Sequence, residues 1–341
     1  MNKVDHFPSI SVIVTVLNEV DTIDELMGTL VTQSQTPQAI VITDGGSTDG
    51  TWEKLMGWKQ KKLPVELIME RVRGNRSMGR NKAVQLADTE LIACTDAGCV
   101  PEKTWFEELL KEQKRSGVQV VAGYYQGLPQ SDFQVAQIPY VLVMPDQVDP
   151  TTFLPATRSM LFNRQWLINN GGFDETLADN EDYALARKIR NLQQSSREKI
   201  LSFTNTAIVG WRPRKTLQEF TWMIFRFARG DARAHLWRPK VALIFLRYLL
   251  LFCLLIMQLF FQTKQLSIVI VLAVSVYLLW SIAKNLRYAQ SAWYWLPILQ
   301  VTSDFAVMSG TIAGLAQKCQ ETKLCDFLEK NESKRRKNRS H

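Results

Sequence analysis

Acidic residues and glycines follow two predicted strands of this chain. Asp96 lies in residues 90–99, ELIACTDAGC, where an apolar run gives way to Ala97 and Gly98. Asp44 ends an earlier apolar run and begins the segment DGGSTDGT. In open α/β sheets, ligands bind outside the carboxyl ends of the strands, so we predict that both carboxylates line one binding site. A simple turn after a strand would also account for Asp96 taken alone.

Two other groups of charged residues have side chains suited to chemistry. Arg76 and Arg80 belong to a segment that contains Gly79-Arg80-Asn81. Guanidinium groups form bidentate hydrogen bonds with phosphate oxygens, which makes both arginines candidates for phosphate contacts; a surface charge on a helix is the alternative for Arg80. Glu181 and Asp182 form an acidic pair after GGFDETLADN, and an acidic pair can also simply cap the helix that follows.

The composition excludes several other kinds of site. The chain has only three histidines, which argues against a multi-histidine metal centre or a Ser/His/Asp triad. Its five cysteines form no CxxC pair, so a reduced, cytosolic compartment is the simplest interpretation. No GxGxxG follows the first predicted strand, which argues against a dinucleotide-dependent oxidoreductase. The first ten residues show no signal peptide.

The elements that must position these residues alternate between strand and helix. We predict strands at residues 10–16, 39–43, 65–69, at the run that ends at Asp96, and at 118–123. Helices are expected between them, including one that begins at Pro101, since proline is common in a first helical turn. This alternation predicts an α/β fold with a largely parallel, doubly wound sheet.

Five short motifs occur in one order along the chain. They are Asn18-Glu19, DGGSTDGT from Asp44, Gly79-Arg80-Asn81, Asp96-Ala97-Gly98, and GGFDE followed by Glu181-Asp182. In this order they strongly resemble glycosyltransferase family 2, over residues 9–235. The resemblance implies a Rossmann-like GT-A fold and inverting transfer of a sugar from a nucleotide-sugar donor.

The resemblance also implies roles for individual residues. Asn18, Glu19 and Asp44 would bind the base and ribose of the donor, together with Asp96. Arg76 and Arg80 remain the candidates for its phosphates. Asp182 would be the general base toward the acceptor hydroxyl, with Glu181 beside it.

A divalent metal is the cofactor that the resemblance implies. Asp96 matches the first aspartate of the DxD motif of the family, which binds Mg²⁺ or Mn²⁺ and so neutralises the diphosphate. The position of the second aspartate is Gly98 in this chain. One expected ligand is therefore missing, so that either donor phosphates and water complete the coordination or the dependence on metal is weaker.

The chain becomes strongly apolar after residue 240. Residues 241–261 and 266–283 are long enough to cross a bilayer core of ~30 Å, and Arg247 near one end could reach the interface. Residues 293–316 contain Pro297 and Asp304, so we expect a re-entrant or interfacial segment there. Asp304 would line a polar pocket or lie in an interfacial helix.

Basic residues flank the apolar region and help to orient it. The net charge of the chain is +8, and arginines between residues 212 and 238 alternate with aromatic residues. Residues 216–237 therefore resemble an interfacial helix, although an amphipathic core helix is the alternative. The basic run 334–339 favours a cytosolic tail by the positive-inside rule. Basic residues beside an apolar block favour a membrane or a phosphate-bearing ligand over nucleic acid.

We therefore expect four parts: a catalytic domain at 1–215, an interfacial amphipathic helix at 216–238, a membrane region at 239–317 and a basic tail at 318–341. The expected protein is a multi-pass enzyme of the cell inner membrane with its catalytic domain in the cytosol. It would be an inverting glycosyltransferase of hexosyltransferase type, acting on a lipid-linked or other membrane-associated acceptor in exopolysaccharide or cell-envelope synthesis. A catalytically silent nucleotide-sugar-binding membrane protein is the alternative. A nucleotidyltransferase is disfavoured because no glycine-rich phosphate loop follows the first strand.

Overall fold

The chain folds into two compact units. The computed structural model describes residues 9–236 and 238–337 of the 341-residue chain. One unit comprises Met1–Ser131 and Ile138–Pro213, and the other comprises Asp132–Gln137 and Arg214–His341. Each unit is described below by itself.

The first unit alternates strands with helices as predicted, and then adds shorter elements. In chain order these are β1 (Ile10–Val16), α1 (Ile23–Val31), β2 (Ala39–Asp44), α2 (Thr51–Lys59), β3 (Glu66–Arg71), α3 (Arg76–Leu86), β4 (Leu91–Cys94), β5 (Cys99–Pro101), α4 (Trp105–Ser116), β6 (Val120–Gly127), η1 (Pro145–Gln147), η2 (Thr157–Ser159), β7 (Met160–Asn163), α6 (Arg164–Asn169), α7 (Glu181–Ser195) and β8 (Leu201–Trp211). The helix α5 (Asp132–Val141) is shared between the two units.

Among the described residues, eight strands form one sheet in the order β3-β2-β1-β4-β7-β6-β8-β5. β1 to β4 pair in parallel, and so do β6 and β8. β7 is antiparallel to both β4 and β6, and β5 is antiparallel to β8. The sheet is thus parallel in its first half and mixed in its second. The long connection between β6 and β7 lets the chain reverse direction before it re-enters the sheet.

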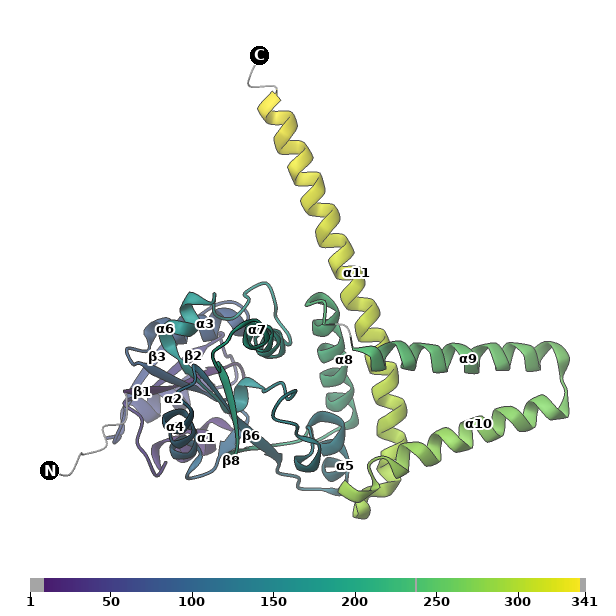
Figure 1. Ribbon diagram of the computed structural model, residues 1–341, viewed down its shortest axis with the longest axis horizontal. Helices are drawn as coiled ribbons and strands as arrows, with labels where there is room; N and C mark the ends of the chain where they lie inside the picture. The colour runs from purple at the N-terminus through teal and green to yellow at the C-terminus, as the bar shows by residue number, and fades with distance from the viewer. Residues whose placement is uncertain (1–8, 237, 338–341) are drawn as a thin grey trace. The chain divides into compact units, whose positions relative to one another are not determined.

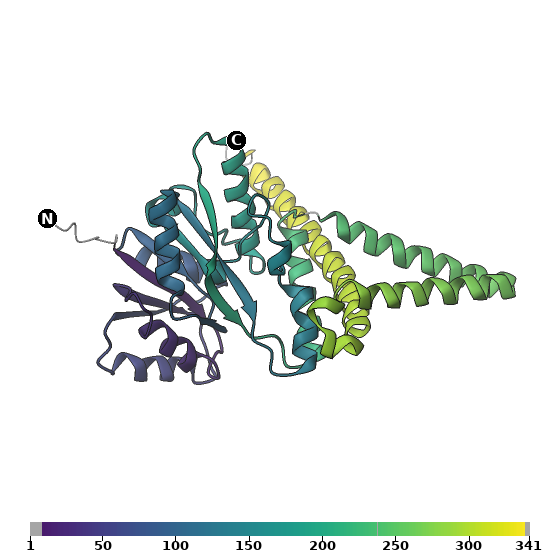
Figure 2. The same ribbon diagram turned by 60° about the horizontal axis from the view of Figure 1, so that its bottom comes forward.

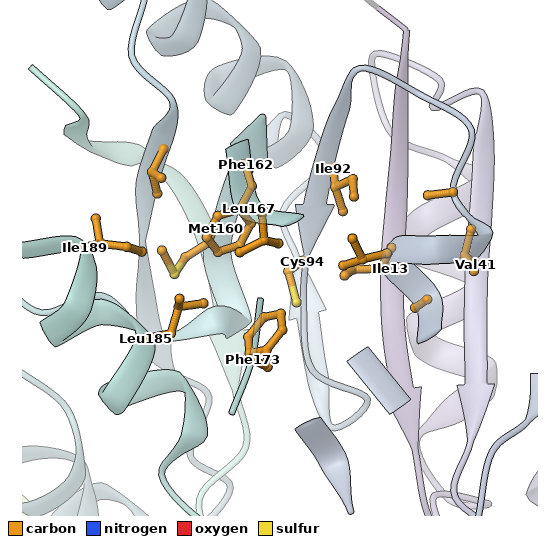
Figure 3. Packing of buried hydrophobic residues seen from close by; sticks show 14 of the residues in the cluster. Ile13, Val41, Ile92, Cys94, Met160, Phe162, Leu167, Phe173, Leu185 and Ile189 are labelled. Carbon is orange, nitrogen blue, oxygen red and sulfur yellow. The ribbon is translucent and has the colours of Figure 1, made fainter. Parts of the chain in front are cut away.

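Helices cover both faces of this sheet. Strand residues of one face, such as Ile13, Val41 and Phe162, pack with side chains from α3, α6 and α7. Figure 3 shows this core, in which Leu167 and Leu185 reach toward the strands. In Figure 1, α1, α2 and α4 lie on the opposite side of the sheet. The two apolar layers hold the strand ends in fixed positions.

One predicted helix start is wrong. Pro101 does not open a helix; it is the last residue of β5, and α4 begins at Trp105. Pro101 lies opposite Val209 of β8 at the end of the strand order. Proline is tolerated there because an edge strand does not need every backbone N–H group for pairing.

The second unit is helical and strongly apolar. Its main elements are α8 (Leu217–Arg233), α9 (Pro239–Phe261), α10 (Lys264–Ala283), η3 (Leu286–Tyr288), η4 (Gln290–Trp295) and α11 (Leu296–Lys337). Within the described part of the chain, three segments could cross a membrane by length and composition: Pro239–Phe261, Lys264–Tyr288 and Gln290–Lys318. The apolar side chains of α9 and α10 are mostly exposed, as suits helices that face lipid. Figures 1 and 2 show these two helices as a hairpin beside α11.

The helix α11 packs closely against α8. A Cβ atom added at Gly310 would lie 2.3 Å from the carbonyl oxygen of Phe225, and one at Gly314 would lie 2.5 Å from that of Arg229. Both distances are too short for any side chain. Two glycines four residues apart therefore let the backbones of the two helices touch, as small residues do at helix crossings.

A buried carboxylate joins α11 to the hairpin. Asp304 is 1% exposed and accepts hydrogen bonds from Arg247, Tyr248 (3.3 Å), Tyr277 and Gln300 (2.9 Å). The expectation that Arg247 reaches the interface stays a prediction; in the structure its guanidinium forms an ion pair with Asp304. Pairing satisfies both charges at less cost than leaving either alone in an apolar region.

Of the two arrangements expected for residues 293–316, a re-entrant turn is absent from the described residues, whereas an interfacial segment stays a prediction. α11 runs without a break from Leu296 to Lys337, and Pro297 lies in its first turn, where proline does not interrupt a helix. The predicted basic tail lies partly beyond this description. Its residues 338 and 339 are outside the described residues, and the rest of the run 334–339 is helical backbone.

Candidate active site

The parallel strands bring the predicted acidic residues to one edge. β2, β1 and β4 are neighbours in the sheet and run in the same direction. The carboxyl end of β1 leads into Asn18-Glu19, that of β2 ends at Asp44, and that of β4 leads into Asp96. Because these strands run in the same direction, the residues that follow them gather at one edge of the sheet.

Hydrogen bonds fix the loops after β1 and β2 to each other. The backbone N–H of Asn18 donates to Ser47 Oγ at 2.9 Å, and the side-chain Oδ1 of Asn18 accepts from the backbone N–H of Thr48 at 2.9 Å. The backbone N–H of Glu19 donates to Thr51 Oγ1 at 2.8 Å. Asn18 has a φ of 56°, a left-handed conformation that asparagine tolerates better than most residues. The Asn-Glu motif and the DGGSTDGT motif thus build one wall.

Asp44 is fully buried in this wall. Its Oδ1 accepts from the backbone N–H (3.0 Å) and the hydroxyl (2.6 Å) of Ser47. Its Oδ2 lies 3.4 Å from Arg71 Nε and has no hydrogen-bond partner in the described structure. One carboxylate oxygen is therefore left for a hydrogen-bond donor such as a ribose hydroxyl.

Gly79 sets the position of Arg80. A Cβ atom at Gly79 would lie 3.0 Å from Thr15 of β1 and 3.2 Å from Thr43 of β2, so glycine lets α3 rest directly on these strands. Thr43 Oγ1 donates to the carbonyl of Gly79 at 3.0 Å. The next residue of the motif, Asn81, exchanges hydrogen bonds with the backbone of Phe173 at 2.8 and 2.9 Å. The Gly79-Arg80-Asn81 motif thus ties α3 to the GGFDE segment.

Arg80 links the two acidic motifs. Its Nη2 lies 2.7 Å from Asp96 Oδ1, and its Nη1 pairs with Glu181 Oε1. The Arg80 side chain is 2% exposed, and that of Glu181 is fully buried. Arg76 Nη1 lies 3.4 Å from the same Glu181 oxygen, but its own side chain is 47% exposed. Arg80 thus holds both carboxylates, and Arg76 is the arginine that solvent can reach.

The charges around Asp96 and Asp182 shift their pKa values in opposite directions. Burial disfavours ionisation of Asp96, but Arg80, Arg158 and Arg76 outweigh it and hold the pKa of Asp96 below its ordinary value. Burial raises the pKa of Asp182, and the neighbouring Glu181 raises it further. Asp96 therefore gives up its proton more readily than an ordinary aspartate does, whereas Asp182 holds its proton more strongly.

The sequence interpretation overlooked Arg158. It lies in η2 between β6 and β7, and its positive charge helps to lower the pKa of Asp96 and counteracts part of the rise in the pKa of Asp182. No motif marks it. The available signal was an arginine directly before the buried strand β7, a place where a surface charge is not expected.

The residues at this edge could supply only some of the ligands of a divalent metal. Asp96 is 31% exposed on its side chain. A Cβ atom at Gly98 would meet only Glu19 Oε2, at 3.9 Å. Among the described residues, no group of three or more His, Cys, Asp and Glu side chains could hold a metal. Mg²⁺ is usually bound by one or two carboxylates together with substrate phosphates, and Asp96 fits that mode.

Comparisons with known proteins find similarity to glycosyltransferases. Residues 11–167 match the family described as Glycosyl transferase family 2. Glycosyltransferase AglE of Haloferax volcanii is 25% identical over 118 residues, which are 34% of this chain and 39% of that protein. Glycosyltransferase GlyG of Streptococcus pneumoniae is 24% identical over 200 residues, 53% of this chain and 66% of that protein. The matched parts thus span less than two thirds of these relatives.

A solved structure extends the similarity in fold. It is the mannosyltransferase PcManGT from Pyrobaculum calidifontis in complex with GDP-Man and Mn²⁺, with a TM-score of 0.61 and 17% sequence identity. The match covers 92% of this chain and 89% of that chain. Residues 11–167 are therefore similar to glycosyl transferase family 2, the fold is GT-A-like, and the helices that follow are apolar enough for a membrane anchor.

Proposed function

We propose that this protein is a membrane-bound inverting glycosyltransferase of hexosyltransferase type. It would transfer a sugar from a nucleotide-sugar donor to a membrane-associated acceptor, such as a lipid-linked saccharide, in polysaccharide or cell-envelope synthesis. The observation that carries the proposal is the position of Arg80 between Asp96 and Glu181, beside Asp182. This arrangement brings a carboxylate of lowered pKa, Asp96, close to a carboxylate of raised pKa, Asp182.

On the donor side, we assign Asn18, Glu19 and Asp44 to the nucleoside. The Oδ2 of Asp44, which has no hydrogen-bond partner in the described structure, supports this role. Arg76 is the better candidate for phosphate contact, because its side chain is half exposed. Arg80 is bound by two carboxylates, so in place of the phosphate contact expected from its sequence we assign it the positioning of both.

Asp96 would hold the metal, with donor oxygens completing the coordination. Mg²⁺ or Mn²⁺ bound there supplies positive charge to the departing diphosphate. The solved mannosyltransferase of similar fold contains Mn²⁺ and GDP-Man, which supports a donor of this class.

For the transfer itself, we assign the general base to Asp182. The acceptor oxygen attacks the anomeric carbon on the face opposite the diphosphate, and Asp182 takes the proton of the acceptor hydroxyl. One displacement inverts the anomeric centre, so an α-linked donor yields a β-linked product. Glu181 is fully buried and paired with Arg80, which places it as a fixed neighbour that raises the pKa of Asp182.

The acceptor assignment is supported by the helices of the second unit. The exposed apolar surfaces of α9 and α10 suit lipid contact. We assign the protein to the cell inner membrane, as a multi-pass protein with the first unit on the cytosolic side. A lipid-linked saccharide is an acceptor that such a protein meets at the membrane surface.

Detergent-purified full-length protein tests the proposal. It should be incubated with a panel of nucleotide sugars, with Mg²⁺, Mn²⁺ or EDTA, and with a membrane lipid extract as acceptor. We expect metal-stimulated turnover of one donor, reduced about 10²- to 10⁴-fold in Asp182→Asn. Gly98, in place of a carboxylate, keeps a silent nucleotide-sugar-binding protein as the second candidate. Donor binding without turnover under all conditions would favour that candidate.

A further inference from the structure

Arg158 is held in place by the strands around it. The next residue, Ser159, accepts a hydrogen bond from Trp105 Nε1 at 2.9 Å and donates one to the carbonyl of Ala207 at 3.1 Å. The preceding residue, Thr157, is fully buried. The residues on both sides of Arg158 are thus held in place, which fixes the position of its Cα atom in the first unit.

The guanidinium of Arg158 lies near two aromatic rings. It is 4.9 Å from the ring centre of Tyr125 and 5.8 Å from that of Trp211. Nε and Nη1 are both buried, and neither has a hydrogen-bond partner in the described structure. A buried donor without a partner carries a large desolvation penalty. Such groups are rare, and a ligand that accepts their hydrogen bonds is one explanation.

The neighbours of Arg158 show where such a ligand would lie. β7 is antiparallel to β4, with Met160 opposite Cys94, so Arg158, two residues before Met160, lies level with Asp96, two residues after Cys94. In keeping with this position, the Arg158 charge lowers the pKa of Asp96 and counteracts the rise in the pKa of Asp182. Asp96 is the residue assigned to the donor diphosphate and its metal, and Asp182 is the residue assigned to the acceptor hydroxyl. Arg158 therefore acts electrostatically on both halves of the reaction centre.

We propose that Arg158 binds the diphosphate of the nucleotide-sugar donor and stabilises it as the leaving group. This inference rests on the proposed function. Guanidinium N–H groups are geometrically matched to phosphate oxygens, and the two rings reduce the access of water, which strengthens such hydrogen bonds. The role also accounts for Gly98. Because Gly98 stands where a second metal-binding carboxylate is expected, the metal would be held by fewer protein ligands, and the fixed positive charge of Arg158 would help to neutralise the diphosphate.

The role of Arg158 in the transfer follows from the movement of charge. The acceptor oxygen forms a bond to the anomeric carbon, and the bond from that carbon to the β-phosphate oxygen breaks. The electron pair of the broken bond stays on the phosphate oxygen, and the acceptor proton moves to Asp182. Nε and Nη1 of Arg158 donate hydrogen bonds to the charge that develops on the diphosphate.

Nucleotide binding to the detergent-purified full chain tests the proposal separately from turnover. The probes are UDP and GDP with their monophosphates UMP and GMP, titrated by calorimetry in EDTA and again with Mn²⁺. In the wild type, we expect the diphosphate to bind more tightly than the monophosphate. In Arg158→Gln, this preference for the diphosphate in EDTA should fall by about 10-fold or more, the effect of losing a hydrogen bond between charged groups. Affinity for the monophosphate should change little, which shows that the site is folded.

Two further variants control for charge and geometry. Arg158→Lys keeps the positive charge but loses the planar guanidinium with its several N–H donors, so it should retain part of the preference for the diphosphate. Arg115→Gln removes an exposed arginine that pairs with Glu112 on α4, and it should keep the full preference. A wild-type preference in both Arg158 variants would overturn the assignment of Arg158 and leave the proposed function standing. Failure of the wild type to bind any of the nucleotides would overturn both.

Discussion

Arg80 is the residue on which the geometry of the candidate site depends. Its side chain is almost fully buried, and its two terminal nitrogens each pair with a carboxylate of a different motif. The attraction between buried charges offsets their desolvation only while both partners are present. Arg80 therefore positions Asp96 and Glu181 before any ligand binds.

Replacing Glu181 tests this dependence. Glu181→Gln leaves a buried guanidinium short of one anion, which costs about 3 kcal/mol and lowers the midpoint of thermal unfolding by about 6–12 °C. The measurement is thermal unfolding of the detergent-solubilised full chain. Arg76→Gln is the matched control, because Arg76 contacts the same carboxylate from an exposed position and should cost about 1 kcal/mol at most. Equal shifts for the two variants would contradict a central role of Arg80.

The raised pKa of Asp182 predicts the acid side of the pH profile. A general base must be ionised in the free enzyme, and burial and Glu181 together raise the pKa of Asp182 above the ordinary 3.8. As pH falls, kcat/KM should therefore begin to decline at a pH above that value. Steady-state kinetics from about pH 3 to about pH 8, at about unit intervals, would measure this decline.

A control carboxylate separates this effect from general acid damage. Asp24 pairs with Lys54 at 2.6 Å, and its pKa is lowered by that contact. Asp24→Asn should leave the acid limb of kcat/KM where it is in the wild type. An acid limb at or below 3.8 in both proteins would argue against Asp182 as the base.

How much of the site could be predicted depends on how far apart in the sequence the interacting residues lie. Asp44, Asp96 and the pair Glu181-Asp182 are recognisable from local spacing, because each sits in a short motif at an element end. The contact of Arg80 with Glu181 joins residues 101 positions apart, and local patterns contain no information on such pairs. Arg158 was missed for the same reason, since only the folded sheet brings it near Asp96.

At the scale of elements too, a helix or strand could be predicted where local contacts form it, and not where it depends on a partner distant in the chain. β1 and α1 were predicted from periodicity, because each buries one set of apolar residues in a local pattern. β5 was not, because three residues with a proline form a strand only by pairing with β8, more than a hundred positions away. The antiparallel insertion of β7 likewise depends on a partner, β4, that is distant in the chain.

The crossing of α8 and α11 provides a test at the scale of elements. Gly314→Leu places a side chain where the backbone of Arg229 already lies, so we expect a loss of about 1–3 kcal/mol from overpacking. The decrease would be seen as a lower melting temperature in detergent. Ser309→Leu is the control, because Ser309 is exposed on the same helix. If Gly314→Leu melts no lower than Ser309→Leu, the close crossing is not present in solution.

For the whole molecule, the membrane topology follows from what α11 packs against. α8 carries Arg226, Arg229, Asp231 and Arg233 and is too charged to cross the bilayer. The backbone of α11 at Gly310 and Gly314 touches α8, so this part of α11 shares the environment of α8. Residues 290–309 precede these contacts, and their helical length of about 30–33 Å only just reaches the ~30 Å of a bilayer core. They also contain Asp304, and an acidic side chain is costly inside a bilayer, which disfavours a third crossing.

We therefore predict two crossings, by α9 and α10, with both ends of the chain on the same side of the membrane. Reporter domains fused before residue 1 and after residue 341 should both be active or labelled on the cytosolic face. A reporter inserted between Gln262 and Thr263, in the turn between α9 and α10, should report the opposite face. Three full crossings would instead place the reporter after residue 341 on the side opposite the first unit. In that case α8 and the second half of α11 could not pack together as the two glycines require, so a split result would overturn both the topology and this helix crossing.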